Sequence, residues 1–480
     1  MTEVESKKTQ DSLQDRLAQV VDLLNRHRLV ENLTQRQEGG HQNRVENLVH
    51  RQNISELQRK LDELHPADIA HILEALPFDD RLAVWQLVKA KHDGDILLEV
   101  SDAVRETLLA DMDDHEILAA AKDMDADELA DLALELPRDV VYELIEGLDA
   151  QDRERVRSAL SYGEEQVGAL MDFEMVTIRD DVSLEVVLRY LRRLKELPGH
   201  TDKLFVVDYE GVLTGVLPIK RLLVNDPDKR VAEVMATDPV IFHPDDEATE
   251  AAQAFERYDL VSAPVIDAGG KLIGRLTIDE MVDLIREETE AEVLNMAGLR
   301  EEEDIFASVW KSVRNRWSWL AINLVTAFLA SRVIGLFDGS IEKLVALAAL
   351  MPIVAGIGGN SGNQTITMIV RAMALDQVVT SNTARLIRKE LGVALINGLV
   401  WGGVIGGVAY WLYDNFALGL VMTAAMTLNL LLAAIMGVLI PMTLLKMGRD
   451  PALGASVMIT AVTDSSGFFI FLGLATIFLM

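Results

Sequence analysis

Long apolar runs fill the C-terminal part of the chain, whereas charged residues interrupt the rest at short intervals. Five runs follow one another at about 317–337, 344–374, 391–413, 418–445 and 451–480. A helix needs roughly 20 residues to cross a hydrocarbon core of about 30 Å, so each run is long enough to span a bilayer. The pattern therefore predicts a transmembrane domain of five helices over residues 305–480.

One carboxylate lies inside the last apolar run. Asp464 is the only charged residue of 451–480. A charge near the middle of a span costs roughly 2.5–3.5 kcal/mol on insertion scales, so it should face water, protein or an ion. We expect Asp464 to handle a cation inside the membrane. The alternative is a structural carboxylate paired with a buried base, for which Arg332 is the candidate because it lies well inside an apolar run.

Glycine and polar residues interrupt the second run. Residues 356–365 read Gly-Ile-Gly-Gly-Asn-Ser-Gly-Asn-Gln-Thr, and glycine weakens a helix while polar groups in a membrane need partners. Gly358 and Gly362 have the Gly-xxx-Gly spacing of close helix packing. The amide side chains favour an aqueous path instead. On that interpretation the pore-lining residues are Gly358, Gly359, Asn360, Gly362 and Asn363.

The charges between the runs predict an orientation. If the first run leaves the cytoplasm, nine of the basic residues after residue 304 fall on the cytoplasmic side, and Arg332 and Lys343 approach the other. Positive charge favours the cytoplasmic side. We therefore expect a multi-pass protein of the bacterial inner membrane, with a cytoplasmic N-terminus, Met480 outside, and lipid around its spans.

Residues 1–304 are strongly acidic. Residues 305–480 hold 11 of the 45 basic and 7 of the 76 acidic residues, which leaves 34 and 69 for residues 1–304, a net charge of −35 against +4. Such a surface repels nucleic acid and suits contact with cations, although acidity also serves solubility. Because the chain has no cysteine, a bound metal must use oxygen or histidine ligands. No Gly-x-x-x-x-Gly-Lys-Ser/Thr phosphate loop occurs, so we expect passive transport and not an enzyme.

Internal repeats divide the acidic part. Residues 206–219 match 265–278 at an offset of 59, and 176–184 match 240–248 at an offset of 64. Each copy reads as two short strands around a tight turn followed by a helix. These repeats predict a tandem pair of α/β modules over residues 163–285.

A helical region precedes this pair, and a charged segment follows it. Residues 56–162 have a helical period, with 65–77 recurring at 125–137, an offset of 60. Residues 1–55 are a polar N-terminal extension to which we assign no function. Residues 286–304 are too charged to enter a bilayer and are expected to form a connecting helix.

Three phrases in the membrane part resemble a known family. Residues 352–364 read Pro-Ile-Val-Ala-Gly-Ile-Gly-Gly-Asn-Ser-Gly-Asn-Gln, residues 463–467 Thr-Asp-Ser-Ser-Gly, and residues 450–452 Asp-Pro-Ala. Together they are similar to the MgtE family of bacterial magnesium channels, and the resemblance extends over about residues 60–480. It implies a multidomain membrane protein with an α-helical superhelical N-domain, tandem α/β CBS domains and a five-helix transmembrane domain. It also implies a homodimer with the pore on its axis, where Asp464 holds a hydrated Mg²⁺.

The resemblance further implies cytoplasmic ion sites and a plug. In the family the helix at 286–304 closes the cytoplasmic mouth of the pore. The acidic positions that match the family's ion sites are Asp95, Asp127, Asp131, Asp259, Glu280, Asp283 and Glu288. Each of these is alternatively a solvated surface carboxylate.

The CBS resemblance raises the question of nucleotide. Such modules commonly dimerise and often bind adenine nucleotides, which implies Thr277 and Glu280 as ATP-binding residues. The sequence departs from the family's Gly-x-x-Thr-x-x-Asp signature, because Glu280 stands in place of the ribose-binding Asp. In the first copy Pro218 replaces the Thr. Binding and absence of ATP therefore both remain open.

The chemistry of Mg²⁺ independently supports a pore between subunits. Mg²⁺ prefers octahedral oxygen ligands and dehydrates reluctantly, so two Asp464 carboxylates related by a dyad could hold it through water. Mg²⁺ shared between acidic modules would draw them together and close the pore at high internal concentration. One alternative is a broader divalent cation transporter that also takes Co²⁺, Ni²⁺ or Mn²⁺. Another is a membrane-anchored nucleotide sensor, which would need neither Asp464 nor a polar second span.

Overall fold

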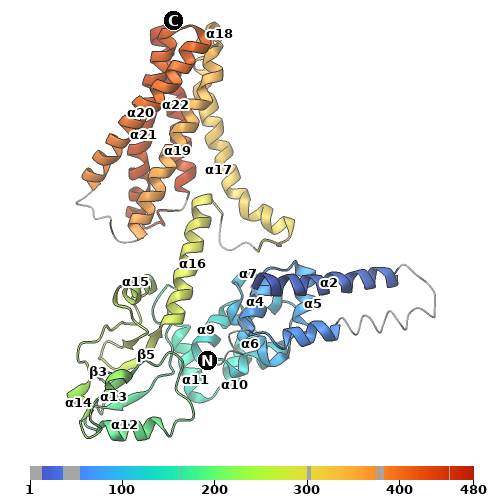
Figure 1. The fold of residues 1–480 in the computed structure, drawn as a ribbon, viewed down its shortest axis with the longest axis vertical. Coiled ribbons are helices and arrows are strands. Elements are labelled where there is room, and N and C mark those ends of the chain that lie inside the picture. Colours follow the sequence, from blue (N-terminus) through green and yellow to red (C-terminus); the bar gives the residue numbers. More distant parts are fainter. Residues whose placement is uncertain are drawn as a thin grey trace. The chain divides into compact units, whose positions relative to one another are not determined.

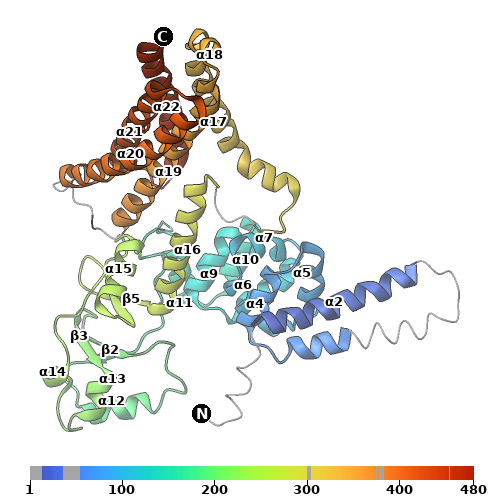
Figure 2. The same cartoon turned by 45° about the horizontal axis from the view of Figure 1, so that its top comes forward.

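The computed structural model describes residues 13–35, 54–163, 165–299, 304–374, 377, 383–452 and 454–480, and the structural statements below concern these residues (Figures 1 and 2). The chain divides into two compact units, residues 1–288 with 304–306, and residues 289–303 with 307–480. The expected fold class is confirmed: a helical N-domain and a CBS pair in the first unit, and a helical membrane region in the second.

Short helices of nearly constant spacing build the N-domain. Successive segments begin at residues 66, 78, 90, 102, 114, 126, 138 and 150, which is one start every 12 residues. The elements are α4 (Pro66–Glu74), α5 (Phe78–Trp85), η1 (Ala90–His92), α6 (Asp93–Glu99), α7 (Asp102–Leu109), α8 (Asp114–Ala120), η2 (Ala121–Asp123), α9 (Ala126–Glu135), α10 (Arg138–Gly147) and α11 (Ala150–Ala159). The predicted 60-residue offset equals five of these steps, so the repeated unit is shorter than the sequence comparison indicated.

Acidic residues begin several of these helices. Asp113 and Asp125 each form a capping box with the Glu three residues later, which satisfies backbone N–H groups that have no partner within the helix. Part of the acidity of this domain is therefore structural.

Part of the predicted polar extension packs into the N-domain. Helix α2 (Leu13–Gln35) buries Val20, Leu23 and Leu24 in the same hydrophobic core as Leu57 and Leu61. A helix that looks polar overall thus has one apolar face, and burial of that face attaches it to the domain. The parts of the extension at 1–12 and 36–53 lie outside the described residues.

The CBS pair confirms the repeat at an offset of 59. In the first copy β2 pairs with β3, Lys203 opposite Pro218; in the second β4 pairs with β5, Ser262 opposite Thr277. Gly211 and Gly270, 59 residues apart, turn the two hairpins with positive φ of 84° and 78°. The strands are β1 (Thr177–Arg179), β2 (Lys203–Val207), β3 (Leu213–Pro218), β4 (Ser262–Ile266) and β5 (Leu272–Thr277), and β1 is parallel to β2. The helices are α12 (Leu184–Leu191), α13 (Ile219–Val224), α14 (Val231–Val234) and α15 (Ala248–Tyr258).

The connecting helix begins earlier than the sequence indicated. Helix α16 (Ile278–Ala297) starts directly after β5 and continues without a break past residue 286. The second CBS copy and the connecting segment therefore share one helix. Asp304–Phe306, at the far end of the predicted connecting segment, belongs to the first unit.

Five long helices form the membrane unit, as predicted. They are α17 (Val309–Gly335), α19 (Ala346–Ala374), α20 (Thr383–Tyr413), α21 (Phe416–Lys446) and α22 (Ala455–Leu479), with the short α18 (Asp338–Lys343) between the first two. In the described part of the chain, α17, α20, α21 and α22 are long and apolar enough to cross a membrane. Helix α19 has 29 residues, but its glycine and amide residues lower its mean hydropathy. Helix α21 contacts α19, α20 and α22, which lie side by side with it in both views (Figures 1 and 2).

Candidate functional site

Asp464 lies in the middle of α22 and is half-buried. The alternative of a structural pair with Arg332 finds no support, because among the described residues no ion pair joins the two side chains. Arg332 is exposed and places its Cζ 4.7 Å from the centroid of the Phe328 ring. The carboxylate is therefore not neutralised by the one base that the sequence offered.

The glycines of α19 pack against its neighbours. Gly358, Gly359 and Gly362 are buried, and a Cβ added at Gly362 would lie 2.4 Å from the Cγ1 of Ile459 on α22. Close helix packing, one of the two interpretations of this run, therefore accounts for the glycines.

The amides of the same helix lie on a different face. Asn360 is exposed in the single subunit and Asn363 is half-buried. The amides thus remain available to an aqueous path, and their pore-lining role stays a prediction.

Asn429 joins three helices at this level of the membrane unit. It is fully buried on α21, and its Nδ2 donates to the Val354 carbonyl of α19 at 3.0 Å. A Cβ added at Gly358 or at Gly467 of α22 would lie 2.2 or 2.7 Å from that Nδ2. Gly467 is one helical turn from Asp464, so Asn429 fixes the helix that carries the carboxylate.

Sequence reasoning missed Asn429, although a signal existed. It is the only amide in the apolar run 418–445, and a polar side chain inside a span usually has a partner or a function. Glu390 was also missed, because the third run was started at residue 391. Helix α20 begins at Thr383, so Glu390 lies inside the helix, buried, with Thr365 Oγ1 at 3.4 Å and Lys389 Nζ at 3.0 Å.

In the first unit the structure brings two of the predicted cytoplasmic residues together. Asp127 lies in the first turn of α9 and Glu280 in the first turn of α16. Burial, followed by the nearby Asp127 charge, raises the pKa of Glu280 to about 8. Burial, followed by the charge of Asp172, raises the pKa of Asp127 to about 7. We call Asp127 and Glu280 the acidic pair.

The acidic pair fits a divalent cation that keeps part of its water. Asp127 Oδ1 is buried and has no hydrogen-bond partner in the described residues. Carboxylate oxygens are the ligands that Mg²⁺ prefers, and the ion commonly uses one or two of them with water in the other positions. The described residues contain no group of three or more His, Asp or Glu arranged to hold a metal, so a fully protein-liganded site is not present there.

Asp131 already has a cationic partner. Its Oδ2 lies 3.1 Å from Nη1 of Arg105, which also pairs with Glu135 Oε1 at 2.8 Å. The guanidinium supplies the positive charge that an ion would otherwise bring. Asp131 is therefore a weaker candidate ligand than Asp127, which lies one turn earlier on α9.

The other predicted residues are spread over the first unit. Asp95 on α6 is exposed and 3.8 Å from His92 Nδ1, Asp259 is exposed in the left-handed conformation after α15, and Asp283 is exposed on α16. Glu288 accepts a hydrogen bond from the Thr249 side chain. Thr277, predicted to bind nucleotide, is buried at the end of β5.

Comparison with known proteins covers both units. Family models match the MgtE intracellular N domain at residues 64–165, CBS domains at 167–226 and 231–287, and MgtE, described as a divalent cation transporter, at 351–474. A protein of Thermus thermophilus named magnesium transporter MgtE is 30% identical over 433 residues, 88% of this chain and 95% of the relative. The chain belongs to the MgtE family.

Further relatives agree with the assignment to the MgtE family. A magnesium transporter MgtE of Bacillus subtilis is 25% identical over 426 residues, 89% of this chain and 94% of the relative. The crystal structure of the soluble part of a magnesium transporter is 21% identical, with a TM-score of 0.45, over 58% of this chain and 99% of that one. The cytosolic domain of the Mg²⁺ channel MgtE in complex with ATP is 29% identical, with a TM-score of 0.36, over 48% and 99%.

Two glycines of α19 provide a matched test of helix packing. In Gly358→Ala the new Cβ meets Asn429, so we expect the membrane unit to lose about 1–3 kcal/mol of stability. Gly356→Ala is the control, because a Cβ at Gly356 meets nothing within 4 Å in the subunit. Thermal unfolding in detergent should separate the two variants. Equal melting temperatures would show that Asn429 does not hold α19.

The acidic pair makes the response to Mg²⁺ depend on pH. Asp and Glu ionise near pH 4 in the unfolded chain, so the stability tied to the raised pKa values of Glu280 and Asp127 is full below about pH 4 and is lost as pH rises through about 7 and 8. Mg²⁺ needs the ionised oxygens, and its binding should strengthen over the same range. We expect the Mg²⁺ concentration that half-protects the first unit from proteolysis to fall about tenfold between about pH 6 and pH 8.5.

The control for this pH dependence removes both titrating groups. The combined variant Asp127→Asn and Glu280→Gln should respond to Mg²⁺ almost equally at the two pH values. A response that keeps the wild-type pH dependence in this variant would assign it to other carboxylates.

Proposed function

We propose that this protein is a Mg²⁺ channel that carries the ion passively into the bacterial cytoplasm through a pore on the axis of a homodimer. The observation that carries the proposal is Asp464, the only charged residue of α22, which has no basic partner among the described residues. Its position in the membrane, half-buried beside the packed face of α19, supports a role toward an ion. The relatives named magnesium transporter favour Mg²⁺ as that ion.

A hydrated ion suits a single carboxylate in each subunit. Two Asp464 side chains across a dyad would balance the charge of one Mg²⁺ while water fills its coordination shell. The exposed Asn360 could hydrogen-bond to such water from α19. An inside-negative potential favours entry by about 4.6 kcal/mol per 100 mV, twice the single-charge value, so no fuel is required. This direction of transport requires the predicted orientation, with the acidic first unit in the cytoplasm and the C-terminus outside.

Cytoplasmic Mg²⁺ is proposed to close this pore. The acidic pair joins α9 of the N-domain to α16, which continues from the second CBS copy toward the membrane unit. Without a cation the two carboxylates cannot both be charged at low cost, and with Mg²⁺ between them they can. Closure follows to the extent that the closed state binds Mg²⁺ more tightly than the open state. Asp95, Asp259, Asp283 and Glu288 are proposed as further contributors.

ATP is proposed only as a regulator. The tandem CBS domains and the ATP complex of another MgtE cytosolic domain support binding of a nucleotide. Thr277 is buried, and Glu280 adjoins Asp127. Phosphates near Glu280 would therefore need Mg²⁺ as a counter-ion.

A broader divalent specificity is the second candidate. It is favoured by the family description, divalent cation transporter, and by oxygen ligands, which also accept Mn²⁺, Co²⁺ and Ni²⁺. Flux of each metal into liposomes containing the purified protein distinguishes the candidates. Equal flux of Mg²⁺ and Co²⁺ would replace the Mg²⁺-selective proposal, and no flux of any divalent ion would favour the nucleotide sensor.

Removal of the charge at Asp464 should abolish or strongly impair Mg²⁺ uptake. Asp464→Asn keeps the shape of the side chain, and Asp464→Ala also removes its bulk, so similar losses would identify charge as the cause. Gel filtration checks that both variants remain folded. Wild-type flux from folded Asp464→Ala in liposomes would refute the pore assignment.

Neutralising the acidic pair should leave the pore open at high internal Mg²⁺. The loss of repulsion in Asp127→Asn and Glu280→Gln favours compaction, but we expect the loss of the shared ion to dominate because closure depends on ligands from both elements. Glu210→Gln, an exposed acid in the first CBS copy, is the control for net charge. Patch-clamp currents across an internal Mg²⁺ series give the measurement. Closure at the wild-type concentration would remove the acidic pair from gating.

A further inference from the structure

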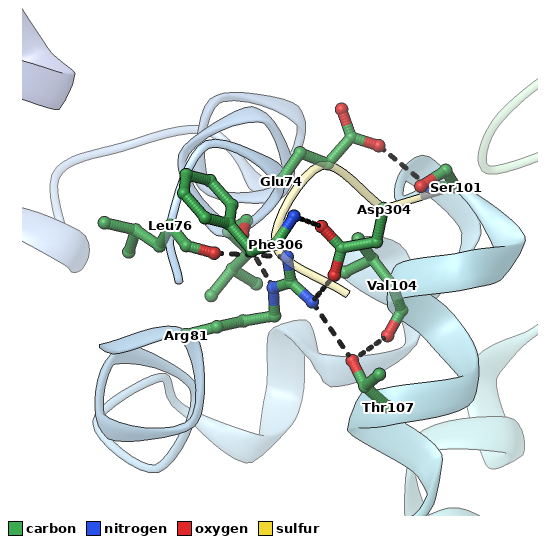
Figure 3. Close-up of polar contacts among 9 residues, drawn as sticks. Glu74, Leu76, Arg81, Ser101, Val104, Thr107, Asp304 and Phe306 are labelled. Atoms are coloured by element: carbon green, nitrogen blue, oxygen red, sulfur yellow. Dashed lines mark hydrogen bonds and ion pairs between the residues drawn. The ribbon is translucent and has the colours of Figure 1, made fainter. Parts of the chain in front are cut away.

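Arg81 carries a fully buried charge in the N-domain. It has no exposed surface, and it donates through Nε to the Leu73 carbonyl at 2.9 Å and through Nη2 to the Leu76 carbonyl at 3.1 Å. These bonds satisfy carbonyl groups at the end of α4 (Figure 3). Nη1 donates to Thr107 Oγ1 at 3.3 Å and to Asp304 Oδ2 at 2.7 Å.

Arg105 occupies the same place two helix starts later. It lies 24 residues after Arg81 and donates to the carbonyls of Leu97 and Val100. Its acceptors are thus 8 and 5 residues earlier, as they are for Arg81. The charge of Arg105 is met inside the domain by three carboxylates, those of Asp102, Asp131 and Glu135.

The residues 24 positions before these three carboxylates do not neutralise Arg81. Phe78 replaces Asp102, and Thr107 replaces Asp131 while keeping the hydrogen bond to the arginine. Asp111 replaces Glu135, but its carboxylate accepts from Gln86 Nε2 at 3.4 Å. A buried charge without a counter-charge is strongly destabilising. In this repeat the acids of the domain have left the charge to be met from elsewhere.

Asp304 supplies the missing carboxylate from 223 residues further along the chain. Its side chain is 6% exposed, and its Oδ1 accepts the backbone N–H of Phe306 at 2.8 Å. Figure 3 shows this short turn beside Arg81 and Thr107. Asp304–Phe306 groups with the first unit, yet α17, the first long helix of the membrane unit, begins only three residues later at Val309.

We propose that Arg81, with Thr107 and the carbonyls of Leu73 and Leu76, is a docking socket for the acidic segment Asp304–Phe306. The socket ties the N-domain to the chain that leads directly into α17. Three residues span at most about 11 Å, so a displacement of the docked N-domain must be taken up by α17 or by release of Asp304. The docking itself is independent of the proposed function, whereas its role in closing the pore rests on it.

Two variants remove the docking by different routes. Asp304→Asn takes away the incoming charge and leaves Arg81 buried without a counter-ion. Thr107→Asp restores the acid that Asp131 provides to Arg105, so Arg81 is neutralised inside the domain and Asp304 loses its partner. Thr107→Asn is the matched control, because it has nearly the same shape as the Asp and no charge.

Amide hydrogen exchange of the full-length protein in detergent measures the docking. We expect exchange at Asp304–Phe306 to accelerate about tenfold or more in both Asp304→Asn and Thr107→Asp, and to change less than about twofold in Thr107→Asn. The N-domain should melt at a lower temperature in Asp304→Asn and recover in the double variant with Thr107→Asp. Unchanged exchange in the two charge variants, or a double variant less stable than Asp304→Asn alone, would overturn the socket.

Mg²⁺-dependent closure measures the coupling. We expect the internal Mg²⁺ concentration for half-closure to rise about threefold or more in Asp304→Asn and Thr107→Asp, and to stay near the wild-type value in Thr107→Asn. Faster exchange with unchanged closure would overturn the coupling. A wild-type protein without Mg²⁺ flux would refute the proposed function and leave the exchange result standing, because exchange does not depend on transport.

Discussion

The cost of taking a charge out of water governs the sites of this protein. Asp464 in the membrane unit, the acidic pair Asp127 and Glu280, and Arg81 in the N-domain are each wholly or partly buried. The three cases differ in how the charge is balanced. Arg81 has a fixed partner in Asp304, so its pair is permanent while the segment stays docked. The carboxylates have no basic partner of comparable strength among the described residues, and a mobile cation is the natural counter-charge.

This difference separates structure from regulation within one domain. Arg105 and Asp131 form a fixed pair one turn from Asp127, where Oδ1 has no partner in the described residues. Two acids on the same helix therefore have different chemistry, although their sequence context is alike. An ion that enters would compete with a guanidinium at Asp131, but with protons at Asp127, since the pKa of Asp127 is raised to about 7. Asp127 is thus the position where Mg²⁺ can act at neutral pH.

Sequence reasoning found the features that follow from composition and period. Apolar runs of sufficient length, the offset of 59 between the CBS copies and the lone charge of α22 need no knowledge of tertiary contacts. It failed where partners come from distant parts of the chain. The pairing of Arg81 with Asp304 spans 223 residues, and the 24-residue relation to Arg105 shows only once the helix starts are known. Asn429 carried a local signal, but its role depends on glycines of two other helices. Which of the predicted acids bind an ion stays a prediction, because ion binding depends on how carboxylates from separate elements meet.

The continuous helix α16 changes how the two units can influence each other. A flexible linker would dissipate a displacement of the CBS pair, whereas a helix that begins at Ile278 and ends at Ala297 transmits it along its axis. Within the membrane unit, Asn295 of this helix donates to Asp450 at 3.0 Å, close to the start of α22. The helix that holds Glu280 at one end therefore contacts, near its other end, the loop that leads to Asp464. Ion binding at the acidic pair and ion passage at Asp464 are consequently joined by a single rigid element, and the coupling between them is limited by the stability of that helix.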